Sequence, residues 1–188
     1  MTPLGITVAA GCAALVLLVP LWLITTRNRL VRRRGRVDDA WARLDVQLRL
    51  RYDLVPSLVR AARAHAAHER DTLEVAERAH EAALGASGPA DRARAEVALR
   101  RGVRGLLALS AAYPQLRADT GFAGLLRQLE ATEDRTAYAR QSYNDAVSAF
   151  NTAVGRFPAR FAAGRPGFRA CEPFLTAEGG SGPSMVRF

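Results

Sequence analysis

The chain has 188 residues and a formal net charge of +9, with 27 basic residues against 18 acidic ones. This length allows one domain with a sizeable core, together with an anchor and a tail. Its two cysteines, Cys12 and Cys171, lie in unrelated contexts and are not expected to pair, so a disulfide framework and a cysteine-based zinc site are both excluded.

The positive charge is concentrated at the two ends of the chain. Residues 1–36 hold six arginines and no acidic residue, whereas residues 37–154 hold 16 basic and 16 acidic side chains and are neutral. The remaining excess lies in residues 155–188. Because a nucleic-acid-binding domain carries its basic excess on its own fold, the pattern predicts no nucleic acid partner. Arginines beside an apolar segment favour anionic lipid headgroups instead.

An apolar segment opens the chain. Ile6 to Ile24 contains 19 residues without a charged side chain, close to the roughly 20 residues that cross a hydrocarbon core. No basic residue precedes this segment and no small-residue cleavage site follows it, so we expect an uncleaved transmembrane anchor over residues 1–26 rather than a signal peptide. The alternative is lipidation of Cys12, because Ala9–Cys12 loosely resembles a bacterial lipobox. The apolar run that continues past Cys12 disfavours it.

A basic collar over residues 27–36 follows the apolar segment directly. Its six side chains are expected at the membrane surface, and they are Arg27, Arg29, Arg32, Arg33, Arg34 and Arg36. By the positive-inside rule, the collar predicts a single-pass membrane protein. The N-terminus is then outside, and everything after the span is in the cytoplasm.

Residues 37–158 carry apolar residues at helical spacing and predict four amphipathic helices. The apolar face of the first comprises Val37, Trp41, Leu44, Leu48, Tyr52 and Val55. This helix is expected to break at Asp53–Pro56, because the residue before a proline avoids the helical region. The other three are expected over Pro56–Gly85, Ala90–Ala112 and Thr120–Val154, with Thr120 as the cap of the last. No period-two strand pattern is present, so the prediction is an all-α chain with a transmembrane helix followed by an antiparallel four-helix bundle.

The C-terminal part, residues 159–188, shows no periodicity and predicts an irregular tail. Its phenylalanines Phe161, Phe168 and Phe174 are expected to fold back on the bundle. Gly179–Pro183 is expected to be disordered, since it has almost no apolar side chain to bury.

Several stretches together resemble the bacterial LemA family. They are RNRLVRRRGRVDDAWARLDVQLRLRYDLVPSLV (27–59), AAHERDTL (66–73), residues 106–158 with ARQSYNDAV at 139–147, and the pair Gly167-Phe168. The resemblance implies an N-terminal membrane helix and an antiparallel four-helix bundle, and it brings no catalytic residues. The glycine-rich tail departs from the acidic tails common in that family.

Histidines and carboxylates of the second expected helix give an alternative from the enzyme class, a metal-dependent bundle. Glu77–His80 matches one Glu-x-x-His motif, but di-iron bundles need two such motifs and the sequence has one. The candidate ligands of this alternative are His65, His68, Glu69, Glu77 and His80. No phosphate-binding loop, nucleophile elbow or zinc-protease motif is present. The sequence therefore predicts no catalytic residue, no cofactor and no metal.

A polar stripe runs beside the apolar face of the last expected helix. Its candidate residues, with the adjoining tyrosine, are Glu133, Arg140, Tyr143, Asn144 and Asn151. Asn144 and Asn151 lie one heptad apart, a spacing at which polar residues fix helix register. Glu133 and Arg140 are expected to join Asp45 or Arg51 of the first helix. Two interpretations remain open, namely a polar network in the core and a face onto which a partner protein docks.

Taken together, these patterns predict a membrane-anchored, non-enzymatic helical-bundle protein. It would serve as a scaffold or interaction module for unidentified proteins at the cytoplasmic membrane. The alternatives are the metal-binding bundle and a protein whose arginine collar clusters or remodels anionic lipid. The oligomeric state is left open.

Overall fold

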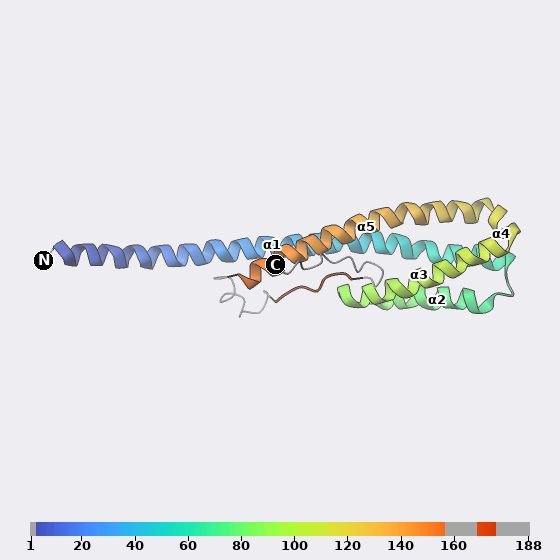
Figure 1. Ribbon diagram of the computed structural model, residues 1–188, viewed down its shortest axis with the longest axis horizontal. Helices are drawn as coiled ribbons and strands as arrows, with labels where there is room; N and C mark the ends of the chain where they lie inside the picture. The colour runs from blue at the N-terminus through green and yellow to red at the C-terminus, as the bar shows by residue number, and fades with distance from the viewer. Residues whose placement is uncertain (1–2, 157–168, 176–188) are drawn as a thin grey trace, which may run out of the picture. The chain divides into compact units, whose positions relative to one another are not determined.

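The structure is a computed structural model that describes residues 3–156 and 169–175, with side chains described from Leu17 onwards. Regular structure in these residues is entirely helical: α1 (Pro3–His65), α2 (Arg70–Gly85), α3 (Gly88–Ala112), α4 (Pro114–Ala118) and α5 (Thr120–Gly155) (Figure 1). The predicted all-α class is therefore confirmed for the described part of the chain. Two compact units are present, and α1 and α5 contribute to both. The first unit comprises residues 1–39 and 146–171, and the second comprises residues 40–145 and 172–188.

The helix α1 runs through Pro56 without a break, so the predicted interruption at Asp53–Pro56 is wrong. A proline inside a helix costs about 3 kcal/mol, because it lacks an amide hydrogen and crowds the carbonyl four residues earlier. Burial offsets that cost. Val55, Leu58 and Val59 are at most 2% exposed, and each fully buried side chain of this kind contributes about 1.5–3 kcal/mol.

The first reversal of the chain lies instead at residues 66–69, where no glycine or proline is present. Side chains on both sides of this turn contact the loop regions around α4. His65 Nε2 lies 3.0 Å from Asp119 Oδ2, and the Tyr113 hydroxyl donates a hydrogen bond to Glu69 Oε1 at 2.9 Å. The turn is thus stabilised by tertiary contacts, and the local sequence contains no residue that signals a turn.

The N-terminus of α5 is capped by the residue before the predicted cap. The amide of Phe122 donates a hydrogen bond to Asp119 Oδ1 at 2.8 Å, the usual geometry of an aspartate N-cap. This hydrogen bond, with the contact to His65, lowers the pKa of the Asp119 carboxyl. Thr120 is therefore the first helical residue, and Asp119 is the cap.

Within the second unit, α1 lies antiparallel to α2 and α5 and parallel to α3. The direction of α2 follows from the short turn at residues 66–69 together with the pair Arg63–Glu77. The other two directions follow from the order of the contacts, Asp45–Arg92 and Arg51–Glu96 with α3, and Trp41–Tyr143 and Arg51–Glu133 with α5. The fully buried side chains of this unit come from each of these four helices and include Leu44, Leu48, Leu58, Leu73, Leu99, Leu106 and Phe122.

The helices α2 and α3 pack closely against each other at two glycines of α3. A Cβ atom added to Gly102 would lie 2.8 Å from the Cα of Ala76, and one added to Gly105 would lie 2.9 Å from Cγ2 of Thr72. Such distances leave no room for a side chain at Gly102. Gly102 therefore allows the backbones of α2 and α3 to approach each other at Ala76, and Gly105 leaves room for the Thr72 side chain.

The first side chains of α1 that the structure describes, from Leu17 onwards, are apolar and exposed. Its large apolar side chains are between 45 and 71% exposed, and they are Leu17, Leu18, Val19, Leu21, Trp22, Leu23 and Ile24. Among the residues that the structure describes, no helix combines the length and the mean hydropathy needed to cross a membrane. The transmembrane helix predicted over Ile6–Ile24 thus has no support from the structure. The side chains of residues 6–16 lie outside the described residues, so before Arg27 only the side chains of residues 17–26 are described.

Candidate functional site

A charged cluster lies inside the second unit, where α1, α3 and α5 meet. The Arg51 side chain is almost fully buried and contacts two carboxylates, Glu96 Oε2 at 3.0 Å and Glu133 Oε1 at 2.5 Å. Glu96 is as deeply buried as Arg51, whereas the Glu133 side chain is 47% exposed. Of the two partners considered for Glu133, the structure places Arg51 beside it, and Asp45 contacts Arg92 instead.

Burial controls the ionisation of this cluster. Removal of the Glu96 carboxyl from water raises its pKa, and the positive charge of Arg51 opposes this effect only in part. Burial and the nearby Glu96 charge likewise raise the pKa of Tyr52. A buried ion pair adds little net stability compared with apolar side chains, but loss of one partner is costly because the other charge remains buried. The cluster is therefore best suited to fixing which residues of the three helices face each other.

The remaining residues of the polar stripe lie further along α5. Arg140 is half-buried. Tyr143 is 2% exposed, its ring centroid lies 5.4 Å from that of Trp41, and its hydroxyl donates a hydrogen bond to the main-chain carbonyl of Glu172 at 2.7 Å. Tyr143 thus connects the core of the second unit to the described part of the C-terminal tail.

The two asparagines of the stripe also bind the tail, each within its own unit. In the second unit, the amide of Phe174 donates to Asn144 Oδ1 at 2.8 Å, and Asn144 Nδ2 donates to the Phe174 carbonyl at 3.2 Å. In the first unit, Asn151 makes the same pair of hydrogen bonds with the main chain of Cys171, both at 2.9 Å. Each asparagine side chain therefore forms hydrogen bonds with both main-chain groups of one tail residue, as a neighbouring β-strand would.

Phe174 is buried, at 2% exposed, as the expected folding back of the tail requires. The other two phenylalanines of that prediction, Phe161 and Phe168, lie outside the described residues, as does the glycine-rich segment Gly179–Pro183.

The arginine collar divides into two groups. Arg33 and Arg34 are half-buried and contact their own unit: Arg33 donates to the Ala149 carbonyl at 2.8 Å, and Arg34 lies 3.0 Å from Cys171 Sγ. Burial raises the pKa of the Cys171 thiol, against the charge of Arg34. The exposed members of the collar are Arg27, Arg29, Arg32 and Arg36.

The candidate metal ligands of the enzyme-class alternative do not converge. His65 contacts Asp119, Glu69 accepts from Tyr113, and Glu77 pairs with Arg63. His68 is exposed and His80 is half-buried on α2. Within the described ranges, 3–156 and 169–175, no group of three or more His, Cys, Asp or Glu side chains is arranged to hold a metal ion.

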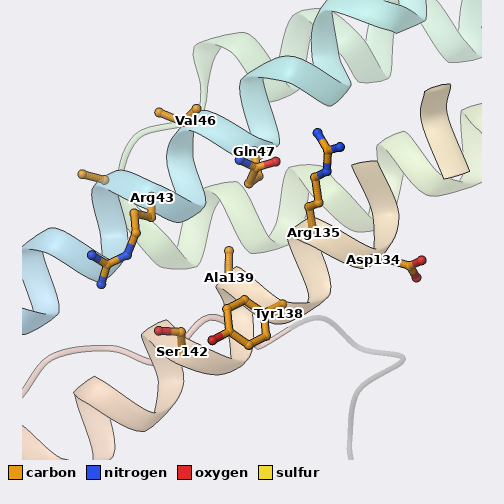
Figure 2. A pocket seen from close by; sticks show the side chains of 9 residues that line it. Arg43, Val46, Gln47, Asp134, Arg135, Tyr138, Ala139 and Ser142 are labelled. Carbon is orange, nitrogen blue, oxygen red and sulfur yellow. The ribbon is translucent and has the colours of Figure 1, made fainter. Parts of the chain in front are cut away.

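An open groove of about 700 Å³ lies between α1 and α5 of the second unit, and Figure 2 shows the side chains that line it. The lining is mostly apolar, with Val46 on one side and Tyr138 and Ala139 on the other. Arg43 and Arg135 lie among these residues. Tyr138 is 78% exposed and Val46 is 53% exposed. Sequence reasoning missed this groove, although a tyrosine on the outer face of α5 and a valine on the outer face of α1 were the available signals.

The comparison with known proteins concerns the part of the chain that contains these features. The sequence model of the LemA family matches residues 40–188. The charged cluster, the groove and the tail contacts of the second unit all lie inside that match, whereas the exposed apolar residues of α1 and the arginine collar precede it. No curated protein matches the chain.

Proposed function

The chain belongs to the LemA family, and on this premise we propose that it is a non-enzymatic scaffold held at the bacterial cytoplasmic membrane. The apolar residues of α1 before Arg27 are the anchor, and the helices from residue 40 onwards are the interaction module. The N-terminus lies outside the membrane and the second unit lies in the cytoplasm.

The observation that carries this proposal is the exposed apolar surface at the start of the described part of α1. Seven large apolar side chains between Leu17 and Ile24 are 45 to 71% exposed. They occupy every position from 17 to 24 except Pro20 and so surround the helix. A helix that is apolar on all faces needs an apolar environment on all faces. The exposed arginines that follow are suited to anionic headgroups, at roughly 1 kcal/mol each. Their position sets the proposed orientation.

The groove between α1 and α5 supports the interaction role. Its exposed tyrosine, its apolar floor and its two arginines are the residue types enriched where proteins bind one another. We therefore propose this groove as the docking surface of the scaffold for an unidentified cytoplasmic protein.

Replacement of Leu18 and Leu21 by aspartate tests the anchor. In bacteria that produce the full chain, the wild-type protein should remain in the membrane fraction after extraction at alkaline pH, whereas the doubly substituted chain should be extracted. Each charged side chain at the centre of a transmembrane helix raises the free energy of membrane insertion by about 2.5–3.5 kcal/mol. The matched control is Val46→Asp with Leu50→Asp, which places the same charges at exposed apolar positions of the second unit.

Complementation tests the role of the anchor in the cell, with the single variant Leu50→Asp as the control because Val46 lines the groove. In a strain that lacks the gene, the control chain with an intact groove, Leu50→Asp, should restore function and the Leu18→Asp/Leu21→Asp chain should not, although circular dichroism shows both folded. Extraction of the wild-type protein at alkaline pH would refute the anchor. Full complementation by the anchor variant would show that the tether is irrelevant.

Topology is tested by thiol labelling with a membrane-impermeant maleimide. Ala67, exposed in the turn between α1 and α2, is replaced by cysteine in a chain whose Cys12 and Cys171 are alanine. Labelling only after permeabilisation is the expected result. Labelling of intact cells would reverse the proposed orientation and move the search for a partner to the outer side of the membrane.

The exposed arginines favour a second candidate function, the clustering of anionic lipid. Arg27, Arg29, Arg32 and Arg36 are free of the packing contacts that Arg33 and Arg34 make with their own unit. Glutamine at these four positions should then abolish clustering of a fluorescent anionic lipid in vesicles that contain the protein. Unchanged clustering would remove this candidate.

A further inference from the structure

The tail residues 172–174 occupy a site on the second unit that has the chemistry of a peptide-binding site. The Tyr143 hydroxyl donates to the carbonyl of Glu172, and the Asn144 side chain pairs with both main-chain groups of Phe174. These three hydrogen bonds involve only the main chain of the tail, which is how proteins hold extended peptides.

One side chain of the tail adds specificity to this main-chain binding. Phe174 is 2% exposed, and its ring centroid lies 6.3 Å from that of Trp41. Trp41 in turn lies 5.4 Å from Tyr143, and the Arg92 guanidinium lies 5.9 Å from the Trp41 ring. The Phe174 ring therefore packs against an aromatic cluster formed by Trp41 of α1 and Tyr143 of α5. The guanidinium of Arg92, from α3, lies near the Trp41 ring of this cluster.

The residue between the two bound positions fits the same interpretation. Pro173 has no amide hydrogen that would need a partner, and it disfavours a helical conformation of the residue before it. The site thus accepts a short extended segment with proline before a large aromatic residue. Every copy of this chain carries that segment.

We propose that the Trp41/Tyr143/Asn144 site also binds the Pro173-Phe174 segment of a second copy of this chain, so that two copies exchange their tails. All of the contacts above are kept in the exchanged form, and exchange of an identical element is a low-cost route to association. The main chain of Cys171, which pairs with Asn151, moves with the segment in the exchanged form. Residues 157–170 then connect the described helix to the exchanged residues, and a chain of that length can reach up to about 50 Å. The proposal rests on this site alone and does not require the membrane anchor.

The test uses two full-length variants that complement each other. Phe174→Ala removes the aromatic anchor of the tail and keeps the site, whereas Asn144→Leu removes the main-chain clamp and keeps the tail. The variants carry different affinity tags and are mixed in a non-ionic detergent after brief warming. We expect at least tenfold more co-purification in this mixture than when either variant is mixed with a differently tagged copy of itself. All chains have the same apolar helix, so association through that helix is equal in every mixture.

A second measurement shows whether the emptied site is still competent. A synthetic peptide with the sequence of residues 169–175 should bind the Phe174→Ala protein and change its tryptophan fluorescence, and the same peptide with alanine in place of the phenylalanine should not. Peptide binding without preferential co-purification would overturn the exchange and leave a tail that binds only its own chain. Absence of peptide binding to a Phe174→Ala protein with an unchanged circular dichroism spectrum would overturn the site itself.

Discussion

Two parts of α1 are made of similar residues and have opposite surroundings. In the first unit, Leu17, Leu21 and Ile24 are 71, 58 and 57% exposed, whereas Leu44 and Leu48 of the second unit are fully buried. The earlier residues are apolar at successive positions, and the later ones are apolar at every third or fourth position. A bundle of helices covers one face of a helix and leaves the others open. The comparison shows that the spacing of apolar residues along α1, rather than their number, determines which part of the helix packs into the core of the second unit.

The arginines of α1 divide in the same way. Arg29 is exposed in the first unit, whereas Arg51 is 1% exposed and lies between two carboxylates in the second. An exposed charge keeps its hydration and contributes little to stability, but a buried one depends on its partners. Substitution of an exposed residue and of a buried one of the same type should therefore have different effects on stability.

The largest effect is expected from Arg51→Met. This substitution leaves Glu96 buried without its cation and should lower the free energy of unfolding by about 3–5 kcal/mol. Arg29→Met is the matched control and should change it by less than about 0.5 kcal/mol. Urea unfolding followed by circular dichroism measures both. Equal effects would mean that the charged cluster does not form in solution. A chain with Arg51→Met and Glu96→Leu together should lose less stability than Arg51→Met alone.

The next effect concerns two leucines of the same helix. Leu48→Ala removes a fully buried side chain and should cost about 2–5 kcal/mol, since it loses transfer free energy and leaves a cavity. Leu21→Ala, at an exposed position, should cost less than about 0.5 kcal/mol in the same unfolding transition. A similar cost for both would show that Leu21 is buried by protein, and the membrane proposal would lose its main support.

Two glycines should respond to alanine with opposite signs. At Gly102 a Cβ would lie 2.8 Å from the Cα of Ala76, so Gly102→Ala should lower stability by about 1–3 kcal/mol. At Gly35, inside the exposed part of α1, a Cβ meets nothing within 4 Å, and Gly35→Ala should raise helix stability by about 0.5–1 kcal/mol. Thermal unfolding distinguishes the two. A stabilising Gly102→Ala would show that α2 and α3 pack less closely than described.

The smallest effect is a pH dependence from Glu96. Burial raises its pKa above the ordinary value of 4.5, so the folded state holds this proton over a range in which the unfolded state releases it. The contribution of Glu96 to stability therefore increases as the pH falls from neutrality towards 4.5, and it is lost as the pH rises through the raised pKa. Wild-type and Glu96→Gln proteins, unfolded in urea at several pH values, should differ in this slope. Parallel curves would contradict the raised pKa.

Helix ends with a local chemical signal were predictable from the sequence. Gly85, Tyr113-Pro114 and Thr120 lie at or next to observed helix ends, because glycine, proline and polar capping residues act through their own backbone preferences. The signal at Asp53–Pro56 was equally local and was overridden, since the apolar side chains around Pro56 are buried. The turn at residues 66–69 has no such signal and depends on contacts of His65 and Glu69 with residues far along the chain.

The candidate site was predictable in part. The spacing of Glu133, Asn144 and Asn151 singled out the polar face of α5, because helical periodicity places residues on faces. It also named Arg51 as one of two possible partners of Glu133, which the structure confirms. It did not identify the partners of the two asparagines, which are Phe174 and Cys171 of the tail. The groove beside Tyr138 was missed for the same reason, since a groove is a property of two helices and not of one.

By itself, the sequence determined the all-α class, the C-terminal end of α2, the approximate ends of α3 and α5, the apolar faces and the concentration of charge at the two ends of the chain. Those features follow from each residue's own backbone preference and from its spacing to near neighbours. The tertiary structure decided the continuity of α1 through Pro56, the turn at residues 66–69, the partners of Arg51 and the binding site of Phe174. Each of these depends on the balance between a local cost and burial against residues distant in sequence, and that balance is set only when the helices pack.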